Sequence, residues 1–296
     1  MKKTLTVIAP VFLLLALIAG CSDDSTKPTT GTLTLDINGL GNLGSGYAYE
    51  GWLLVDDMPV STGTFTVNDA GDLSRTEFEV DLEDLNTATK FILTIEPSPD
   101  ADANPSSTHY IAGDFSANMA SLSVADGAAL GDDFADAMGT YILATPTNGS
   151  GTNEDSGIWF LDLSGGSPAV GLMMLPNLPD GWKYEGWAVI DGTPVTTGKF
   201  TSASGMDEND PFSGSTDGPP FPGEDFLMNA PTGLMFPTED LLGGAVVISI
   251  EPDPDNSAMP FAMKPLVGSV PANATDHTNY DMSLNLGSLP TGTASR

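Results

Sequence analysis

The sequence predicts an all-β protein of two tandem β-sandwich (Ig-like) domains, for three reasons. A block of sequence is written twice: residues 49–65 recur as residues 184–200, at a constant spacing of 135 (184 minus 49), with Gly, Trp and Pro in register. Many short strand-like runs alternate with clusters of turn residues. No long helical period of apolar residues is present. A repeat of this length indicates an internal duplication, and short strands with frequent turns favour sandwiches.

Each copy of the repeated block predicts a β-hairpin. The strands YEGWLLV and YEGWAVI are each followed by turn residues that include Asp and Pro, and then by a return strand rich in Val, Thr and Phe. Gly51 and Gly186 leave room for an aromatic ring against the backbone. We therefore interpret Trp52 and Trp187 as core anchors and not as ligand-stacking residues.

The first 30 residues predict a targeting signal followed by a flexible tether. Residues 1–20 begin with two lysines, continue with an apolar run that is short for a transmembrane helix, and end with small residues at a cleavage site. This pattern is typical of a signal peptide. Cys21 follows directly, and Ile-Ala-Gly-Cys resembles the lipobox of bacterial lipoproteins. That resemblance implies lipid attachment at Cys21, which anchors the chain to a membrane outside the cytoplasm. In a cell with two membranes, Ser22 after the cysteine favours attachment to the outer one. The polar composition of residues 21–30 predicts a flexible tether.

The acidic composition limits the partners. A formal net charge of -31 with 9 basic residues repels nucleic acid, so no nucleic-acid partner is expected. The membrane, reached through the lipid on Cys21, and an unidentified protein or small molecule remain as partners. The aspartates indicate either a hydrated acidic surface, which we favour, or cation sites.

The duplication sets the predicted domain boundaries. Residues 31–138 form the first sandwich, with a short helix possible over residues 126–138, and residues 139–296 form the second. An apolar strand ends at Glu96-Pro97 in the first unit and at Glu251-Pro252 in the second, now 155 residues apart (251 minus 96). The 20 extra residues predict an inserted loop at 206–226, a candidate binding loop.

The repeated signature resembles a known family. Tyr-Glu-Gly-Trp, then Asp, Pro-Val-Ser/Thr-Thr-Gly-x-Phe and an aliphatic strand ending Thr/Ser-Ile-Glu-Pro, is similar to the C-terminal extracytoplasmic domain of anti-sigma-K factors (RskA-like). The resemblance covers both units and implies small β-sandwiches outside the cytoplasmic membrane. It does not carry over anti-sigma activity, because we expect this chain to lack the sigma-binding domain.

Metal and phosphate motifs are incomplete. The run GLGNLG at 39–44 matches G-x-G-x-x-G, but a strand follows where a phosphate site needs a helix N-terminus, so it predicts a turn. Residues 100–104 open like a calcium loop, yet Pro105 and Ile111 occupy positions that require Gly and Glu. A looser calcium site in the acidic corner 100–104 or 253–256 stays possible. No metal site and no cofactor is therefore assigned.

Catalytic motifs are also missing from the sequence. The repeated glutamates Glu50 and Glu185, and Glu96 and Glu251, are better explained by one structural task in each unit, such as accepting backbone N–H groups at a strand end. His109 and His277 do not align between the units. No nucleophile has a recognisable base, so no catalytic residue is assigned and the protein is expected not to be an enzyme.

These observations predict a non-catalytic cell-envelope lipoprotein that carries an anti-sigma-factor-like binding or sensing module. Its ligand-binding residues are unknown from sequence. The alternative is a calcium-dependent structural or adhesive surface protein, and a glycan-active enzyme using Glu50 or Glu185 is the third reading.

Overall fold

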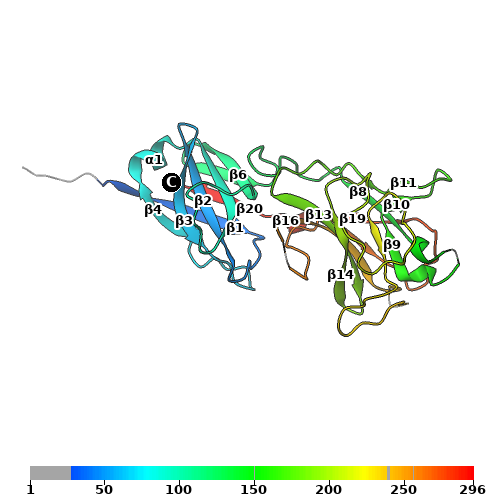
Figure 1. Ribbon diagram of the computed structural model, residues 1–296. Helices are drawn as coiled ribbons and strands as arrows, with labels where there is room; N and C mark the ends of the chain where they lie inside the picture. The colour runs from blue at the N-terminus through cyan, green and yellow to red at the C-terminus, as the bar shows by residue number, and fades with distance from the viewer. Residues whose placement is uncertain (1–27, 150, 239–240, 256) are drawn as a thin grey trace, which may run out of the picture.

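The computed structural model describes residues 28–149, 151–238, 241–255 and 257–296. The predicted signal peptide, Cys21 and most of the tether lie outside these residues. The described chain is nearly all β, with antiparallel strand pairs, so the predicted fold class is confirmed. Figure 1 shows two lobes, which we call the first lobe (β1 to β7 with β20) and the second lobe (β8 to β19).

The first lobe is built on one eight-stranded sheet in the order β3-β2-β5-β6-β7-β20-β1-β4. Phe65 and Phe78, from the two end strands β3 and β4, bring their ring centroids to 6.0 Å, so the sheet folds over on itself in a sandwich-like arrangement. Apolar side chains of β1 alternate into the enclosed core. The elements are β1 (Thr30–Asn38), β2 (Tyr47–Val55), β3 (Met58–Phe65), β4 (Glu77–Asp81), α1 (Leu82–Thr87), β5 (Lys90–Pro97), β6 (His109–Ser116), β7 (Met119–Ser123) and β20 (Thr291–Ser295).

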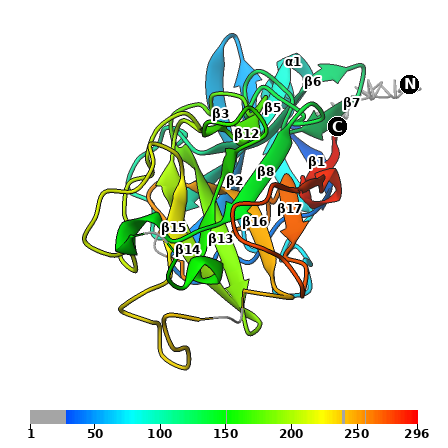
Figure 2. The ribbon, with the colours of Figure 1, turned by 90° about the vertical axis from the view of Figure 1, so that its right-hand side faces the viewer.

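The second lobe combines two five-stranded sheets with a small β10-β11 ribbon. One sheet runs β14-β13-β16-β17-β19, and Figure 2 shows its strands β13, β16 and β17 side by side. The other runs β12-β8-β9-β15, with β18 paired to β8. The strands are β8 (Met138–Leu143), β9 (Gly157–Trp159), β10 (Leu161–Asp162), β11 (Ala169–Val170), β12 (Leu172–Met173), β13 (Trp182–Ile190), β14 (Thr193–Phe200), β15 (Gly223–Asp225), β16 (Ala245–Pro252), β17 (Leu266–Ser269), β18 (Tyr280–Asp281) and β19 (Ser283–Leu284).

The duplicated hairpin is present in both lobes, as β2-β3 and β13-β14. Each copy shifts register directly after the strand glycine, at Gly51 and at Gly186. Trp52 and Trp187 are both 2% exposed, which confirms them as buried anchors. The ring that lies against the glycine is a phenylalanine from another strand or loop, Phe91 in the first lobe and Phe160 in the second.

The lobes share one continuous apolar core at their junction. Tyr110 of β6 packs against Trp182 of β13 and against Phe261, with ring centroids 5.5 and 5.6 Å apart. The Trp182 indole N–H donates to the His109 carbonyl oxygen at 3.0 Å. The lobes therefore meet through aromatic packing and not through a flexible linker alone.

The C-terminal strand β20 departs from the repeat boundaries. It pairs with β1 on one side and β7 on the other, in the first lobe, although residues 139–296 were assigned to the second sandwich. Figure 1 shows this red strand among the blue and cyan strands of the first lobe. Hydrogen bonding thus places residues 291–295 with the first sheet, while the remaining domain boundaries stay predictions.

One local expectation, a helix over residues 126–138, is wrong, and the inserted loop at 206–226 ends in a short strand. Residues 126–137 form turns and irregular structure, and Met138 begins β8. The short helix lies instead at α1, where the Asp81 side chain caps the Glu83 and Asp84 N–H groups. The insertion at 206–226 is not a free loop throughout, because its end is strand β15, paired with β9. Glu224 and Asp225 in that strand are fully buried.

Candidate functional site

The outer face of each repeated sheet carries a chain of polar contacts. In the first lobe, the Trp52 indole N–H donates to Thr94 Oγ1 at 2.9 Å, and Thr94 Oγ1 donates to Glu96 Oε1. On the neighbouring strand, the Ser61 hydroxyl donates to Glu50 Oε1. These side chains share one face because strand residues alternate. The two carboxylates are buried, at 8% exposure for Glu50 and 2% for Glu96.

The second lobe repeats this chain residue for residue. The Trp187 indole N–H donates to Ser249 Oγ at 2.8 Å, and Ser249 Oγ donates to Glu251 Oε1. The Thr196 hydroxyl donates to Glu185 Oε1 at 2.5 Å. Both glutamates are more deeply buried than in the first lobe, at 4% and 1% exposure.

The repeated Glu-Pro corner has the predicted structural task. Glu96 Oε1 accepts the Ser106 N–H at 2.9 Å, and Glu251 Oε1 accepts the Phe261 N–H at 2.8 Å. The interpretation of these two glutamates as backbone acceptors at a strand end is confirmed. Glu50 and Glu185 instead accept hydroxyl groups from the return strand of the hairpin.

Only in the second lobe do the described residues bring a third carboxylate into this group. Ligand atoms of Glu185, Glu251 and Asp255 all lie within 4.8 Å of one another. Lys199 Nζ lies 3.1 Å from Asp255 Oδ2 and donates to the Asp255 carbonyl oxygen at 2.9 Å. Burial raises the pKa of Glu185 to about 7, against the Thr196 hydrogen bond and the Lys199 charge. Burial also raises the pKa of Glu251 to about 7, against its hydrogen bonds from Ser249 and Phe261.

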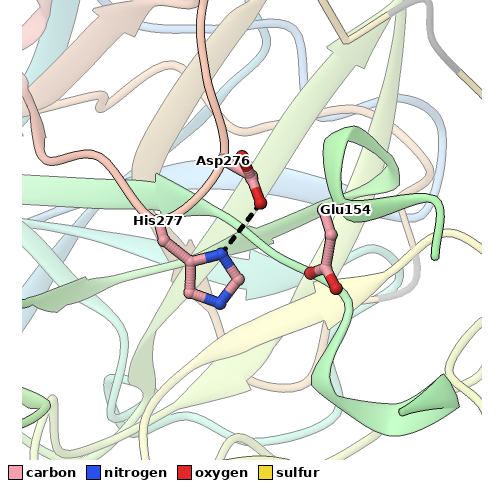
Figure 3. Close-up of side chains that lie close together, drawn as sticks. All are labelled: Glu154, Asp276 and His277. Atoms are coloured by element: carbon pink, nitrogen blue, oxygen red, sulfur yellow. Dashed lines mark hydrogen bonds and ion pairs between the residues drawn. The ribbon is translucent and has the colours of Figure 1, made fainter. Parts of the chain in front are cut away.

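A second group of possible ligands lies elsewhere in the second lobe. Figure 3 shows Glu154 facing Asp276 and His277, whose ligand atoms lie within 4.8 Å of one another. His277 Nδ1 is 3.1 Å from Asp276 Oδ2, and both side chains are about half exposed. Glu154 is already occupied, since its two oxygens accept the Thr145 and Gly151 N–H groups. We therefore give this group less weight than the buried one.

A cleft of about 610 Å³ lies between the lobes. The first lobe contributes loop residues 41–44 with Tyr47, Ile95 and Thr108, and the second contributes much of segment 252–264. The Tyr49 hydroxyl fixes the first wall by donating to the Gly41 carbonyl oxygen at 2.9 Å. On the second wall, Lys264 Nζ donates to the Phe261 carbonyl oxygen at 2.5 Å, and burial lowers the pKa of Lys264. The cleft joins apolar walls to a few polar groups, as ligand sites usually do.

The other motifs from the sequence remain simple turns. The stretch 39–44 precedes β2, with positive φ at Gly39 and Gly44, and has no helix after it. In the corner 100–104, the Asp100 and Asp102 carboxylates accept nearby backbone N–H groups and are exposed. Sequence reasoning did not find the buried set of Glu185, Glu251 and Asp255, although the repeated Glu positions and the acidic corner pointed to its three members.

Part of the first lobe matches a family model. Residues 25–109 match the model described as anti-sigma-K factor rskA, C-terminal. This RskA-like segment runs from before β1 to the first residue of β6. The likeness of the second lobe rests on the internal repeat and its matching contacts. Neither the curated proteins nor the solved structures compared with the chain yield a match.

Proposed function

We propose that this protein is a non-catalytic cell-envelope lipoprotein whose RskA-like lobes form an extracytoplasmic binding or sensing module. The observation that carries the proposal is the cleft between the lobes, where loop 41–44 of the matched segment faces segment 252–264. A cleft at a lobe junction suits sensing, because a ligand that contacts both walls favours one arrangement of the lobes.

The walls indicate the class of ligand. Leu43, Tyr47, Ile95 and Phe261 supply apolar surface, while Asn42 and Lys264 supply donors. The Asp253 carboxylate in the lining, whose side chain is 40% exposed, disfavours a polyanion. A small molecule or peptide segment with an apolar body and a hydrogen-bonding end fits this lining best.

A blocked cleft tests the binding proposal. Met259→Trp places a large ring at the cleft, and Met174→Trp does the same at a similarly exposed methionine outside its lining; the two are 58% and 62% exposed. The full-length protein is incubated with envelope extract, and bound small molecules and peptides are identified by mass spectrometry. We expect a ligand retained by the wild type and by Met174→Trp and lost by Met259→Trp. Equal retention by both variants would contradict the cleft as the site.

Membrane attachment is proposed through Cys21. The supporting observation is the Ile-Ala-Gly-Cys sequence ahead of a polar tether that leads to β1 at Thr30. The described residues contain no helix long and apolar enough to cross a membrane. In cells fed labelled fatty acid, we expect label on the wild type and none on Cys21→Ser, which should leave the membrane fraction. Fractionation of the wild type then tests the expected outer-membrane location.

The gathered carboxylates of the second lobe favour a second candidate function, a cation-dependent structural role at the cell surface. A glycan-active enzyme receives less support, because each repeated glutamate is already a buried acceptor within its own lobe. Substitution Glu50→Gln or Glu185→Gln should therefore leave any glycan turnover in the purified protein unchanged.

A further inference from the structure

We propose that the second lobe holds a calcium ion between the carboxylates of Glu185, Glu251 and Asp255. One oxygen of each side chain belongs to a set that spans no more than 4.8 Å. The donors come from three places that the fold brings together: β13, the end of β16, and the corner that follows β16. The proposal rests on the second candidate function and needs no ligand in the cleft, although Asp255 also lines that cleft.

Two buried oxygens of these glutamates lack a partner among the described residues. Glu185 and Glu251 each use Oε1 to accept hydrogen bonds, whereas Oε2 of each is buried and has no hydrogen-bond partner among the described residues. Their side chains are 4% and 1% exposed, so bulk water does not replace the missing donors. An unpaired buried carboxylate oxygen is costly, and a bound cation removes that cost for both oxygens at once.

The local charge matches a divalent ion. When all three carboxyl groups are ionised, as calcium binding requires, they carry three negative charges, and the Lys199 ammonium, 3.1 Å from Asp255 Oδ2, offsets one. The nearby Lys183 ammonium is already paired with Glu208 at 2.8 Å and Asp253 at 3.3 Å. The set therefore retains two negative charges, which one divalent cation balances.

The chemistry of the donors selects the kind of ion. All three ligands are oxygens, which hard cations prefer, and no imidazole or thiolate is part of the set. Calcium accepts about six to eight oxygens in flexible geometry, so water can complete its shell, whereas magnesium demands a stricter octahedron. A cavity of about 420 Å³ lies beside the set, and its lining includes Glu185, Lys199, Glu208 and Asp253.

The first lobe offers a built-in control. Glu50 and Glu96 occupy the places of Glu185 and Glu251, and Asp100 occupies that of Asp255 (255 minus 155). Asp100 is exposed, and the close carboxylate groups found among the described residues do not include this set. Calcium should therefore bind in one lobe only, even though the glutamates are duplicated.

Calorimetry and thermal unfolding of the full-length chain test the site. We expect one calcium per chain and a melting temperature that rises by several degrees in calcium, beyond the rise in sodium chloride of equal ionic strength. Glu50→Gln and Glu96→Gln should keep this response. Glu185→Gln and Glu251→Gln should weaken calcium binding by more than about tenfold, because each removes a charged ligand. Unchanged binding in the last two variants, or no calcium-specific response in the wild type, overturns the proposal.

Two further variants guard against a folding defect. Asp255→Asn alters a corner residue and should lose calcium binding while its far-ultraviolet circular dichroism stays that of the wild type. Lys199→Met removes a competing positive charge and should tighten calcium binding by about tenfold. If Lys199→Met binds calcium no more tightly and is less stable at every calcium concentration, Lys199 alone neutralises the group, and the ion site is contradicted.

Discussion

The two lobes build the same polar framework, yet they leave their glutamates in different surroundings. In both, a hydroxyl from the return strand and a backbone N–H from the Glu-Pro corner satisfy one oxygen of each carboxylate. Burial raises the pKa of Glu50, but in the second lobe it brings the pKa values of Glu185 and Glu251 to about 7. The hairpin therefore fixes the contacts, while the surrounding loops decide how much solvent reaches the charges.

Loss of β20 should have the largest effect and would show how far the lobes are separable. Deletion of residues 290–296 removes the strand between β1 and β7. It also exposes the part of the first-lobe core that the buried Ala294 covers. We expect the first lobe to lose its cooperative unfolding transition, as followed by calorimetry and limited proteolysis.

Deletion of Arg296 alone is the matched control for that experiment. Its guanidinium donates to the Leu85 and Ala88 carbonyl oxygens, outside the β20 ladder. This variant should keep the first-lobe transition. If the protein that lacks residues 290–296 melts like the wild type, β20 is not needed for the stability of the first lobe.

A methyl group at the strand glycines tests whether the duplicated hairpins are packed alike. A Cβ at Gly51 would lie 2.5 Å from Thr62 Oγ1, and one at Gly186 would lie 2.2 Å from Thr197 Oγ1. We expect Gly51→Ala and Gly186→Ala each to lower the free energy of unfolding by about 1–3 kcal/mol, with the greater loss at Gly186. Denaturant titration measures this, with Gly46→Ala, where nothing lies within 4 Å, as the neutral control.

The insertion of the second lobe should make stability depend on pH through Glu224. This carboxyl is fully buried, and burial raises its pKa to about 8 despite the hydrogen bond from Ser213. The folded protein holds a proton that the unfolded chain releases above its ordinary pKa of 4.5. Stability should therefore fall as pH rises from 5 to 8, by up to about 1.4 kcal/mol per pH unit.

Glu224→Gln isolates that contribution. The variant cannot ionise, so its free energy of unfolding should change less between pH 5 and 8 and should exceed that of the wild type at pH 8. Glu77→Gln, at an exposed glutamate of the first lobe, should keep the wild-type slope. Identical slopes for Glu224→Gln and the wild type would mean that Glu224 is ionised in the folded protein at neutral pH.

The smallest effect is expected at Lys183, which corresponds to Ala48 in the first lobe (183 minus 135). Its partners Glu208 and Asp253 are 44% and 40% exposed, so solvent screens both pairs. Lys183→Ala should cost less than about 1 kcal/mol, and the difference should shrink in high salt. A loss that persists at high salt would indicate packing by the lysine stem.

Features encoded within the duplicated segments could be predicted from the sequence. Both hairpins, the buried Trp52 and Trp187, and the acceptor role of Glu96 and Glu251 follow from local alternation and from the recurrence of each residue. The internal repeat was informative because it indicated that equivalent residues have the same structural role in both units.

Features that depend on distant contacts could not be predicted in this way. Strand β20 has the sequence TGTAS, which has little apolar character, and it is a strand because β1 and β7 supply partners on both sides. From the sequence, Glu224 and Asp225 are expected at the surface. In the structure they lie in the interior, where Ser213 donates a hydrogen bond to Glu224, and Thr147 and Trp159 donate hydrogen bonds to Asp225. The approach of Asp255 to the two glutamates depends on loop geometry that residue spacing does not reveal.

The position of β20 also orders the steps of folding during synthesis. Strand β20 begins 168 residues after the end of β7 (291 minus 123), so β1 and β7 emerge long before the strand that joins them. Until then, each has an open backbone edge that another chain can pair with. Closing a contact over so long a stretch of chain is slow. A factor that shields these edges, or a delay in pairing them until the second lobe has folded, would decide the yield of the native protein.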